Sequence, residues 1–355
     1  MILAESFEKE WIYSHRGKAG FERINPPIAE KMIYALALVE ALAGTRLDFV
    51  FKGGTSLILL LPGPGRFSID IDIITTATKE DVEGSLQSIC TGRPFDTFRL
   101  NERRSYKPGI PKAHYELAYI STLSGKEDHI LLDILFDSHP YPILVKIPID
   151  TDWLQTEGSS VMVKMPSHES IAGDKLAAFA PNTTGVPYNS KKELEIVKQL
   201  FDLGRLYDGI RNMSVTGDSF DSAVQKENIY RGGHLTREDV IQDIIRTGLL
   251  IAKREKNNGE PHASNFKEIQ KGLLQFKAYQ MSSFFRIEEA IVASSKSALM
   301  AARIKTGESG PSELFTPGPG KHKYLISHPD YLFLNKLSME ALFYWHKTLQ
   351  TLKWI

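Results

Sequence analysis

Apolar residues recur along the first part of the chain with two different spacings. Residues 28–43 place apolar side chains three and four positions apart, directly after two prolines that suit the first turn of a helix. Over residues 69–73 the spacing becomes two, and three isoleucines alternate with Asp70 and Asp72. Side chains of a strand point alternately to its two faces. This stretch therefore predicts a strand with isoleucines on the core face and both aspartates on the other.

The rest of the chain divides into a strand-containing part and a helical part. Two further strands are predicted at 115–123 and 129–136. Helices are predicted at 79–90, 167–181, 191–207, 218–230, 236–254, 264–279, 281–305 and 330–352. Residues 93–112 and 137–166 are polar or proline-rich, and we expect irregular structure there. The order of elements predicts an α/β (α+β) domain over residues 1–165 and a mostly helical domain over residues 166–355.

Composition and charge narrow the class of protein. The chain of 355 residues has 43 Lys and Arg against 43 Asp and Glu, so the whole molecule is not a polycation. The charge is unevenly spread, because residues 1–160 hold 17 basic and 22 acidic side chains, whereas residues 226–305 hold 14 and 9. This asymmetry permits an acidic metal site and a basic surface for a polyanion, or it is ordinary scatter of surface charge.

The cysteine content and the N-terminus indicate a compartment. Cys90 is the single cysteine, which excludes an intramolecular disulfide and fits a reducing compartment. No apolar run approaches the roughly 18 residues of a membrane helix. The first residues, MILAESFEKEW, are acidic where a signal peptide would be basic. We therefore expect a cytoplasmic protein with no membrane partner.

A glycine pair precedes the alternating strand, and the two features together suggest chemistry. Gly53 and Gly54 follow a short apolar run, and Thr55 opens a helix-sized apolar segment. Glycine allows another group to approach the backbone closely, and peptide N–H groups at a helix N-terminus suit an anion. Carboxylates at i and i+2 repel unless a cation lies between them, and Mg²⁺ takes such ligands while leaving room for substrate phosphates. Each feature alone is usually a turn or a solvated face.

Three other charged positions have a structural and a functional interpretation. Asp133 is the lone acid of the apolar strand ILLDILF, so it needs either a protein partner or a metal. Lys175, the single cation of the 167–181 helix, either extends to solvent or presents its charge to a nucleotide phosphate. Asp202 lies one turn after Lys198, and the two could simply form an ion pair worth a few tenths of a kcal/mol. The basic residues of 93–112 also have two interpretations: they face a nucleic acid, or they belong to a loop exposed to solvent.

In combination, these motifs resemble a known family. Residues 52–57, KGGTSL, followed by residues 66–73, RFSIDIDI, are similar to the GGT-x-L and R-x-S-x-D-x-D motifs of the AbiEii/AbiGii toxins, which include the MenT toxins. The wider pattern is that of the polymerase-beta-like nucleotidyltransferase superfold. Ile69 departs from it, because relatives often carry an acid there.

Two motifs in the helical part extend the resemblance. Asp174-Lys175-Leu176 is similar to the family's lysine-bearing helix, and residues 198–203, KQLFDL, are similar to its [RK]-D-h-[YF]-D-L motif. Gln199 replaces the usual first acid, which puts a function at that position in doubt but not at Asp202. The resemblance covers about residues 50–205.

The resemblance implies a fold and a set of site residues. The fold would be a nucleotidyltransferase-fold mixed sheet with flanking helices plus a helical C-terminal domain, with the active site in the cleft between the domains. The implied metal ligands, for Mg²⁺, are Asp70, Asp72 and Asp133. The implied nucleotide-binding residues are Gly53, Gly54, Thr55, Ser68 and Lys175. The implied catalytic residues are Asp70, Asp72, Lys175 and Asp202. Ser68 could also be a modification target or a structural hydrogen-bonding residue.

The resemblance also implies a reaction and partners. We expect transfer of NMP from an NTP to an acceptor hydroxyl, that of the 3′ end of tRNA, by a toxin of a toxin–antitoxin or phage-defence system. A cognate antitoxin protein would be its partner. Other functions stay open: the same fold acting on a protein or small-molecule hydroxyl, a kinase-like phosphoryl transfer, or a non-catalytic nucleotide- or RNA-binding module.

Overall fold

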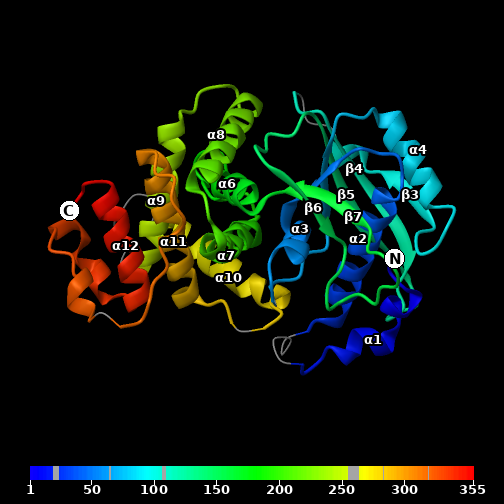
Figure 1. The fold of residues 1–355 in the computed structure, drawn as a ribbon, viewed down its shortest axis with the longest axis horizontal. Helices are drawn as coiled ribbons and strands as arrows, with labels where there is room; N and C mark the ends of the chain where they lie inside the picture. Colours follow the sequence, from blue (N-terminus) through cyan, green and yellow to red (C-terminus); the bar gives the residue numbers. More distant parts are fainter. Residues whose placement is uncertain (19–23, 64, 106–108, 255–263, 283, 319) are drawn as a thin grey trace. The chain divides into compact units, whose positions relative to one another are not determined.

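The computed structural model describes residues 1–18, 24–63, 65–105, 109–254, 264–282, 284–318 and 320–355. These residues divide into two compact units (Figure 1). The first unit comprises Met1–His139, Leu144–Ser167 and Ala278–Ser283, and the second comprises Pro140–Ile143, His168–Lys277 and Phe284–Ile355. The main division, after Ser167, falls two residues beyond the boundary predicted from the sequence. Two short segments are exceptions, because Pro140–Ile143 belongs to the second unit and Ala278–Ser283 belongs to the first.

The first unit is built on a five-stranded mixed sheet with the order β1-β2-β5-β4-β3. Its strands are β1 (Val50–Lys52), β2 (Ile71–Thr75), β3 (Thr97–Leu100), β4 (Lys112–Ile120) and β5 (Glu127–Phe136). The strands β2 and β5 are parallel, whereas the other three neighbouring pairs are antiparallel. The alternation predicted over residues 69–73 is confirmed for its second part, because Ile71 and Ile73 are buried and Asp72 is only half-buried. Its first part is wrong, because β2 begins at Ile71 and residue 69 is half-buried, as residue 70 is.

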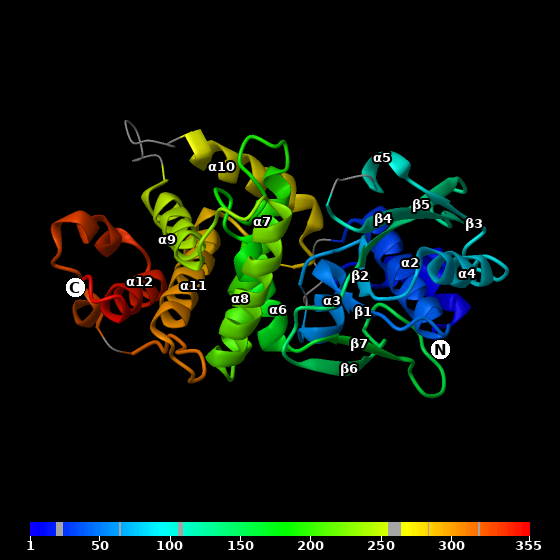
Figure 2. The ribbon, with the colours of Figure 1, turned by 90° about the horizontal axis from the view of Figure 1, so that it is seen from above.

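Helices flank this sheet (Figure 2). They are η1 (Ala4–Phe7), α1 (Lys9–Ser14), α2 (Pro26–Ala43), α3 (Gly53–Leu60), α4 (Lys79–Ile89) and α5 (Glu102–Ser105). The predicted start of α2 is confirmed, with proline in its first turn, and its apolar residues are buried against β5 and α4. The predicted start of α4 is confirmed too, because Thr78 forms a capping box with Asp81.

Two predictions of irregular structure are wrong. The polar stretch 93–112 contains β3, α5 and the first residue of β4, although its residues 106–108 lie outside the described residues. The proline-rich stretch 137–166 contains an antiparallel hairpin, β6 (Leu144–Pro148) and β7 (Met162–Pro166), and β7 contacts β1. Short strands of this kind are formed by pairing with a partner distant in the sequence, so their own composition indicates them weakly.

The second unit is helical. Its helices are α6 (His168–Ala178), α7 (Glu193–Gly209), α8 (Met213–Tyr230), α9 (Arg237–Lys253), α10 (Ser264–Phe276), α11 (Ile287–Thr306), η4 (Lys321–Tyr324), η5 (Pro329–Lys336) and α12 (Met339–Thr351), and η3 (Lys277–Tyr279) begins at its edge. The mixed sheet with flanking helices and the helical C-terminal region confirm the predicted fold class. None of the described helices is long and apolar enough to cross a membrane.

The single helix predicted at 330–352 is two helices instead. The helix η5 ends at Lys336, and the Ser338 side chain then accepts a hydrogen bond from the Ala341 N–H and begins α12. A capping serine competes with helix continuation, because its side chain replaces a backbone acceptor. The aromatic run at 343–345 is buried.

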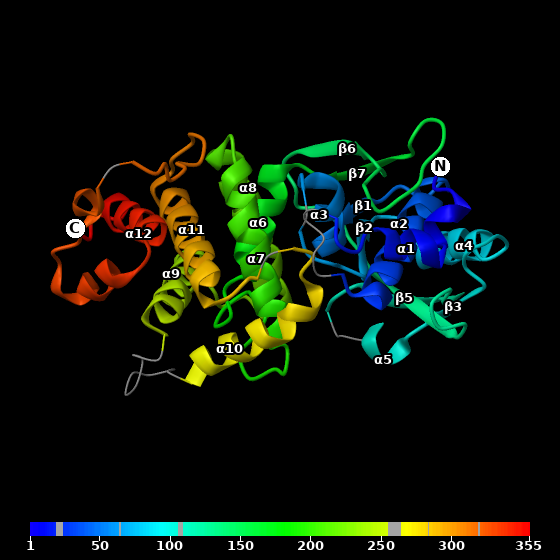
Figure 3. The same ribbon diagram turned by 90° about the horizontal axis from the view of Figure 1, so that it is seen from below.

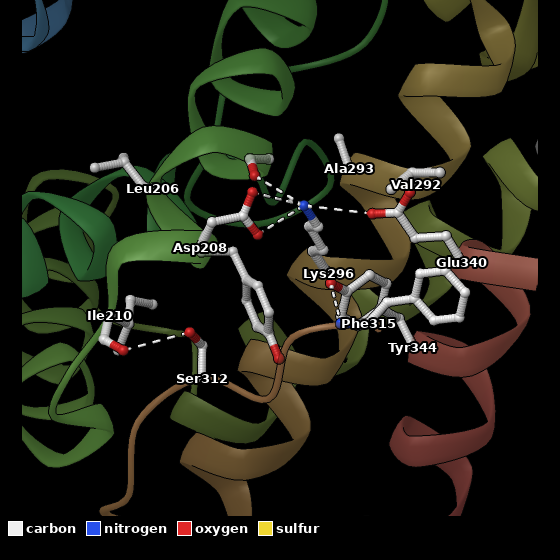
Figure 4. Close-up of polar contacts among 12 residues, drawn as sticks. Leu206, Asp208, Ile210, Val292, Ala293, Lys296, Ser312, Phe315, Glu340 and Tyr344 are labelled. Atoms are coloured by element: carbon white, nitrogen blue, oxygen red, sulfur yellow. Dashed lines mark hydrogen bonds and ion pairs between the residues drawn. The ribbon is translucent and has the colours of Figure 1, made fainter. Parts of the chain in front are cut away.

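A buried lysine joins three helices of this unit (Figure 4). Lys296 of α11 places its Nζ 2.7 Å from an Asp208 carboxylate oxygen of α7 and 3.7 Å from a Glu340 oxygen of α12. The same Nζ lies 3.5 Å from the Gly204 carbonyl oxygen and 5.5 Å from the centre of the Tyr344 ring. An unpaired buried ammonium would be costly, so these contacts favour one arrangement of α7, α11 and α12.

Candidate active site

The glycine pair begins α3 directly after β1, and each glycine lies against a polar side chain. Gly53 has φ +80°, a left-handed conformation that favours glycine. A Cβ added to Gly53 would lie 2.1 Å from Asp72 Oδ2. A Cβ added to Gly54 would lie 2.5 Å from Arg66 Nη2 and 2.8 Å from Ser68 Oγ. Both positions therefore require glycine so that these side chains can approach the start of the helix.

The next two residues of α3 connect the helix to the strand. The Thr55 hydroxyl donates a 2.6 Å hydrogen bond to the Asp70 carbonyl oxygen, immediately before β2 begins. The Ser56 hydroxyl donates to the Gly53 carbonyl oxygen at 2.9 Å. The Thr55 hydroxyl proton is therefore used within the protein. The predicted phosphate contact of Thr55 stays a prediction.

Two of the three predicted metal ligands lie next to each other in the sheet. The register of the parallel pair β2 and β5 places Asp72 beside Asp133, and Asp72 also pairs with Lys52 of β1. Neighbouring strands are about 4.8 Å apart, and in-register side chains point to the same face. Asp70 precedes β2 by one residue. The backbone thus brings together the DxD motif and the lone acid of a strand some 60 residues later.

Asp133 is held by two basic side chains that the sequence did not identify. His114 Nδ1 lies 2.5 Å from Asp133 Oδ1, and the two residues are paired across β4 and β5. Arg104 Nη2 lies 3.6 Å from Asp133 Oδ2. The His114 side chain is only 12% exposed, and its Nε2 is buried without a hydrogen-bond partner among the described residues. Strand register decides this contact, so no local motif could have indicated it.

The chemistry of this face fits a hard divalent cation. Its carboxylates are oxygen donors of the kind that Mg²⁺ prefers, and Asp133 already attracts two basic groups. Within the part of the chain that the structure describes, no three His, Cys, Asp or Glu side chains form a ready-made metal site. Asp72 and Asp133 are in register, and their predicted role as metal ligands with Asp70 stays a prediction.

The helical unit brings together the two other predicted residues. Lys175 Nζ of α6 lies 2.8 Å from Asp202 Oδ2 of α7, and their side chains are 6% and 3% exposed. The lysine thus does not extend to solvent. Its Nζ also donates to the Gln199 side-chain oxygen at 3.1 Å. Gln199 therefore contacts the predicted catalytic lysine although it lacks the acid of the family motif. The i,i+3 spacing of Gln199 and Asp202 on one helix face could have indicated this.

Comparisons with known proteins agree with the motifs. The family model described as nucleotidyl transferase AbiEii toxin, type IV toxin–antitoxin system, matches residues 36–281, a range that includes every predicted site residue. A candidate nucleotidyltransferase from H. pylori is similar in structure, with 17% identity, a TM-score of 0.42, and coverage of 79% of this chain and 94% of that chain. JHP933 from Helicobacter pylori has 16% identity, a TM-score of 0.42, and coverage of 82% and 94%. None of the curated proteins compared with the chain matches it.

The family model spans well over half of the chain, and the fold and the motifs agree with it. The predicted enzyme class, a nucleotidyltransferase, is thereby confirmed. This chain belongs to the AbiEii family of nucleotidyl transferase toxins of type IV toxin–antitoxin systems.

Proposed function

We propose that this nucleotidyltransferase uses Mg²⁺ to transfer NMP from an NTP to the 3′ end of tRNA. The observation that best supports a metal–nucleotide site is the in-register pairing of Asp72 with Asp133 beside the Gly53 backbone. The register brings two carboxylates together, and the glycine pair lets the side chains of Asp72, Arg66 and Ser68 approach the start of α3. These two features suit the two halves of a metal–triphosphate complex.

The carboxylates have defined roles in this proposal. Asp70 and Asp72 would hold Mg²⁺ against the triphosphate, and Asp133 would contact the ion near the acceptor. The bound metal would neutralise phosphate charge and favour ionisation of the acceptor hydroxyl. His114 and Arg104 keep Asp133 in place through the contacts described above.

The residues around α3 would bind the phosphates. The backbone N–H groups of Gly53, Gly54 and Thr55 lie at a helix N-terminus, where the partial positive charge favours an anion. The Ser68 hydroxyl lies against Gly54 and could donate to the same phosphates. Because neither glycine carries a Cβ, the side chains of Asp72, Arg66 and Ser68 can lie against the helix start.

Lys175 would neutralise the charge that develops on the leaving pyrophosphate. In the transfer, the acceptor oxygen bonds to the α-phosphorus, the α–β bridging P–O bond breaks, and the hydroxyl proton passes to solvent. Asp202 and Gln199 would hold the ammonium of Lys175 in one place, so Asp202 is a positioning residue in this proposal. Fixed charges of this kind lower the barrier because they need no reorganisation during the reaction.

The family assignment supports the part of the proposal that concerns the substrate and the partner protein. Type IV toxin–antitoxin membership implies NTP as a substrate and an antitoxin protein as partner. Phage defence and tRNA as the target are the finer expectations that we add. Growth arrest on induced expression, absent from an Asp70→Ala/Asp72→Ala variant, would support the toxin activity in this chain.

The reaction is tested by labelling. Purified protein is incubated with Mg²⁺, total tRNA and each α-³²P-labelled NTP in turn, and the products are separated on denaturing gels. Label on tRNA identifies the acceptor and the preferred nucleotide, and mapping of the labelled end locates the attachment.

Two variants control this test. The Asp70→Ala/Asp72→Ala variant should give no labelled RNA, whereas Asp150→Ala, which removes an exposed carboxylate outside the site, should label RNA as the wild type does. Label on protein, or on a small molecule, would contradict the tRNA proposal and favour another acceptor. Retention of the γ-phosphate label in place of the α-phosphate label would indicate a kinase-like transfer.

A further inference from the structure

The helical unit contains a cavity that none of the predicted site residues lines. Its volume is about 630 Å³, and it is lined by one face of α9, by residues of the 182–188 segment and by Asn265 of α10. The helices α9 and α10 are in contact, and Figure 3 shows them as neighbours. This volume is in the range of small-molecule sites.

The acidic groups of the cavity are already satisfied within the protein. The Asp243 carboxylate accepts hydrogen bonds from the Asn182 N–H and side-chain amide at 2.7 and 2.6 Å, and from the Thr183 hydroxyl at 2.9 Å. Burial raises the pKa of Asp243, which opposes its ionisation further. Asp239 accepts from the Thr236 N–H and hydroxyl in the capping box of α9. Neither carboxylate offers uncompensated negative charge to the cavity.

The donors of the cavity, in contrast, have capacity left. The Tyr188 hydroxyl is buried beside the Thr247 side chain and has no hydrogen-bond partner of good geometry among the described residues. Burial raises the pKa of Tyr188, so the hydroxyl keeps its proton at neutral pH and can donate. Arg246 is exposed on the cavity wall and forms no ion pair with another described residue. The buried side-chain amide of Asn265 and the side chains of Gln242 and Lys253 also line the cavity.

One part of the wall is apolar. Leu235, Leu249 and Leu250 line it, and together they suit the face of a flat ring. A phosphate alone would leave most of the volume empty, and an apolar ligand would leave the Tyr188 hydroxyl unsatisfied. A ligand that satisfied all of these groups would combine an aromatic ring, acceptor groups and negative charge.

We propose that this cavity binds a nucleoside phosphate, with its phosphate at Arg246, an acceptor group at the Tyr188 hydroxyl and its base against the leucines. The nucleotide is either free or part of an RNA chain, because both carry the same groups. This site goes beyond the transfer reaction, since none of its residues takes part there.

The experiment measures binding in a protein whose transfer site is disabled. The Asp70→Ala/Asp72→Ala chain, in EDTA, is titrated calorimetrically with each nucleoside 5′-monophosphate and, separately, with a 5′-phosphorylated RNA tetranucleotide. Adding Arg246→Ala should weaken binding roughly 10-fold or more, because a charge-assisted hydrogen bond is lost. Adding Tyr188→Phe, which keeps the ring, should weaken it about 2- to 10-fold.

Matched controls make the result specific. Arg211→Ala removes another exposed arginine of the helical unit that does not line the cavity, and it should leave binding unchanged. Mononucleotide binding that depends on Arg246 and Tyr188 supports a free-nucleotide site. Arg246-dependent binding of the tetranucleotide alone supports a site for a nucleotide within RNA. Absence of saturable binding of either probe at millimolar concentration, or equal weakening by Arg211→Ala and Arg246→Ala, overturns the proposal.

Discussion

Two predicted site carboxylates, Asp133 in the sheet unit and Asp202 in the helical unit, have very different surroundings. The Asp133 side chain is 25% exposed and contacts His114 and Arg104, the latter at 3.6 Å. The Asp202 side chain is 3% exposed and forms a 2.8 Å ion pair with Lys175. Asp133 is therefore partly open to water, whereas Asp202 is enclosed together with the charge of Lys175.

This difference in surroundings predicts different effects of the two carboxylates on the stability of the fold. Breaking a buried ion pair by removing one partner is expensive, because the other charge remains without compensation. A half-exposed carboxylate on a sheet face costs little to remove from the fold, since water replaces its contacts. We therefore expect Asp202 to affect the stability of the fold and Asp133 to affect mainly the chemistry.

The largest effect is expected from Asp202→Ala. It leaves the Lys175 ammonium buried and should lower the free energy of unfolding by about 3–5 kcal/mol, measured by urea denaturation. The double variant Lys175→Met/Asp202→Leu should recover most of this stability without recovering nucleotide transfer. A double variant as unstable as the single variant would show that the pair is not the cause.

Asp133→Asn should have the opposite effect, a large loss of nucleotide transfer with little loss of stability. We expect a loss of nucleotide transfer on the order of 10²–10³-fold, comparable to removal of one electrostatic group from an active site. The free energy of unfolding, measured by urea denaturation, should change by less than about 1 kcal/mol. If Asp133→Asn destabilises the protein as much as Asp202→Ala, the comparison between the two carboxylates fails.

Gly53→Ala tests the close approach of Asp72 to the start of α3. A left-handed alanine costs about 1–2 kcal/mol, and its Cβ would also displace the Asp72 carboxylate, so both stability and transfer should fall. Gly125→Ala is the control, because Gly125 has φ +68° with nothing within 4 Å of an added Cβ. The control should lose stability but keep full transfer activity.

His114 variants test whether this residue positions Asp133. His114→Gln should weaken Mn²⁺ binding, followed by electron paramagnetic resonance, by about 10- to 100-fold, as is typical for groups that orient a metal ligand. His114→Asn places an amide N–H near the position of Nδ1 and should restore most of the affinity. Equal effects of the two variants would mean that the ring matters for packing and not for its bond to Asp133.

The smallest effect of these substitutions is expected from Glu116→Gln, which changes a carboxylate on the same sheet outside the site. Hydrogen bonds from Asn101 and then Arg99, opposed by burial, hold the pKa of Glu116 below its ordinary value of 4.5. Its stabilisation is present above pH 4.5 and is lost as the pH falls through the lowered pKa of the folded protein. Glu116→Gln should cost about 1 kcal/mol at pH 7. The difference from the wild type, measured by urea denaturation at several pH values, should shrink at pH 3–4.

Local patterns predicted much of the fold. Apolar spacing and proline position, which act within a few residues, predict the helix at 26–43 and the helix beginning at residue 79. The strands β3, β6 and β7 were missed because their pairing partners, and not their own composition, stabilise them. The break before α12 was missed because a capping serine was read as a helical residue.

The sequence by itself determined the family and the types of group in the site. The glycine pair, the DxD motif, Lys175 and Asp202 are recognisable because each motif depends on residues a few positions apart. Only the tertiary structure decided which of these groups meet. Strand register placed Asp133 beside Asp72 and put His114 on Asp133, and the packing of α6 against α7 buried Lys175 with Asp202 and Gln199. Such contacts join residues far apart in the chain, and their energy exists only once the core has formed.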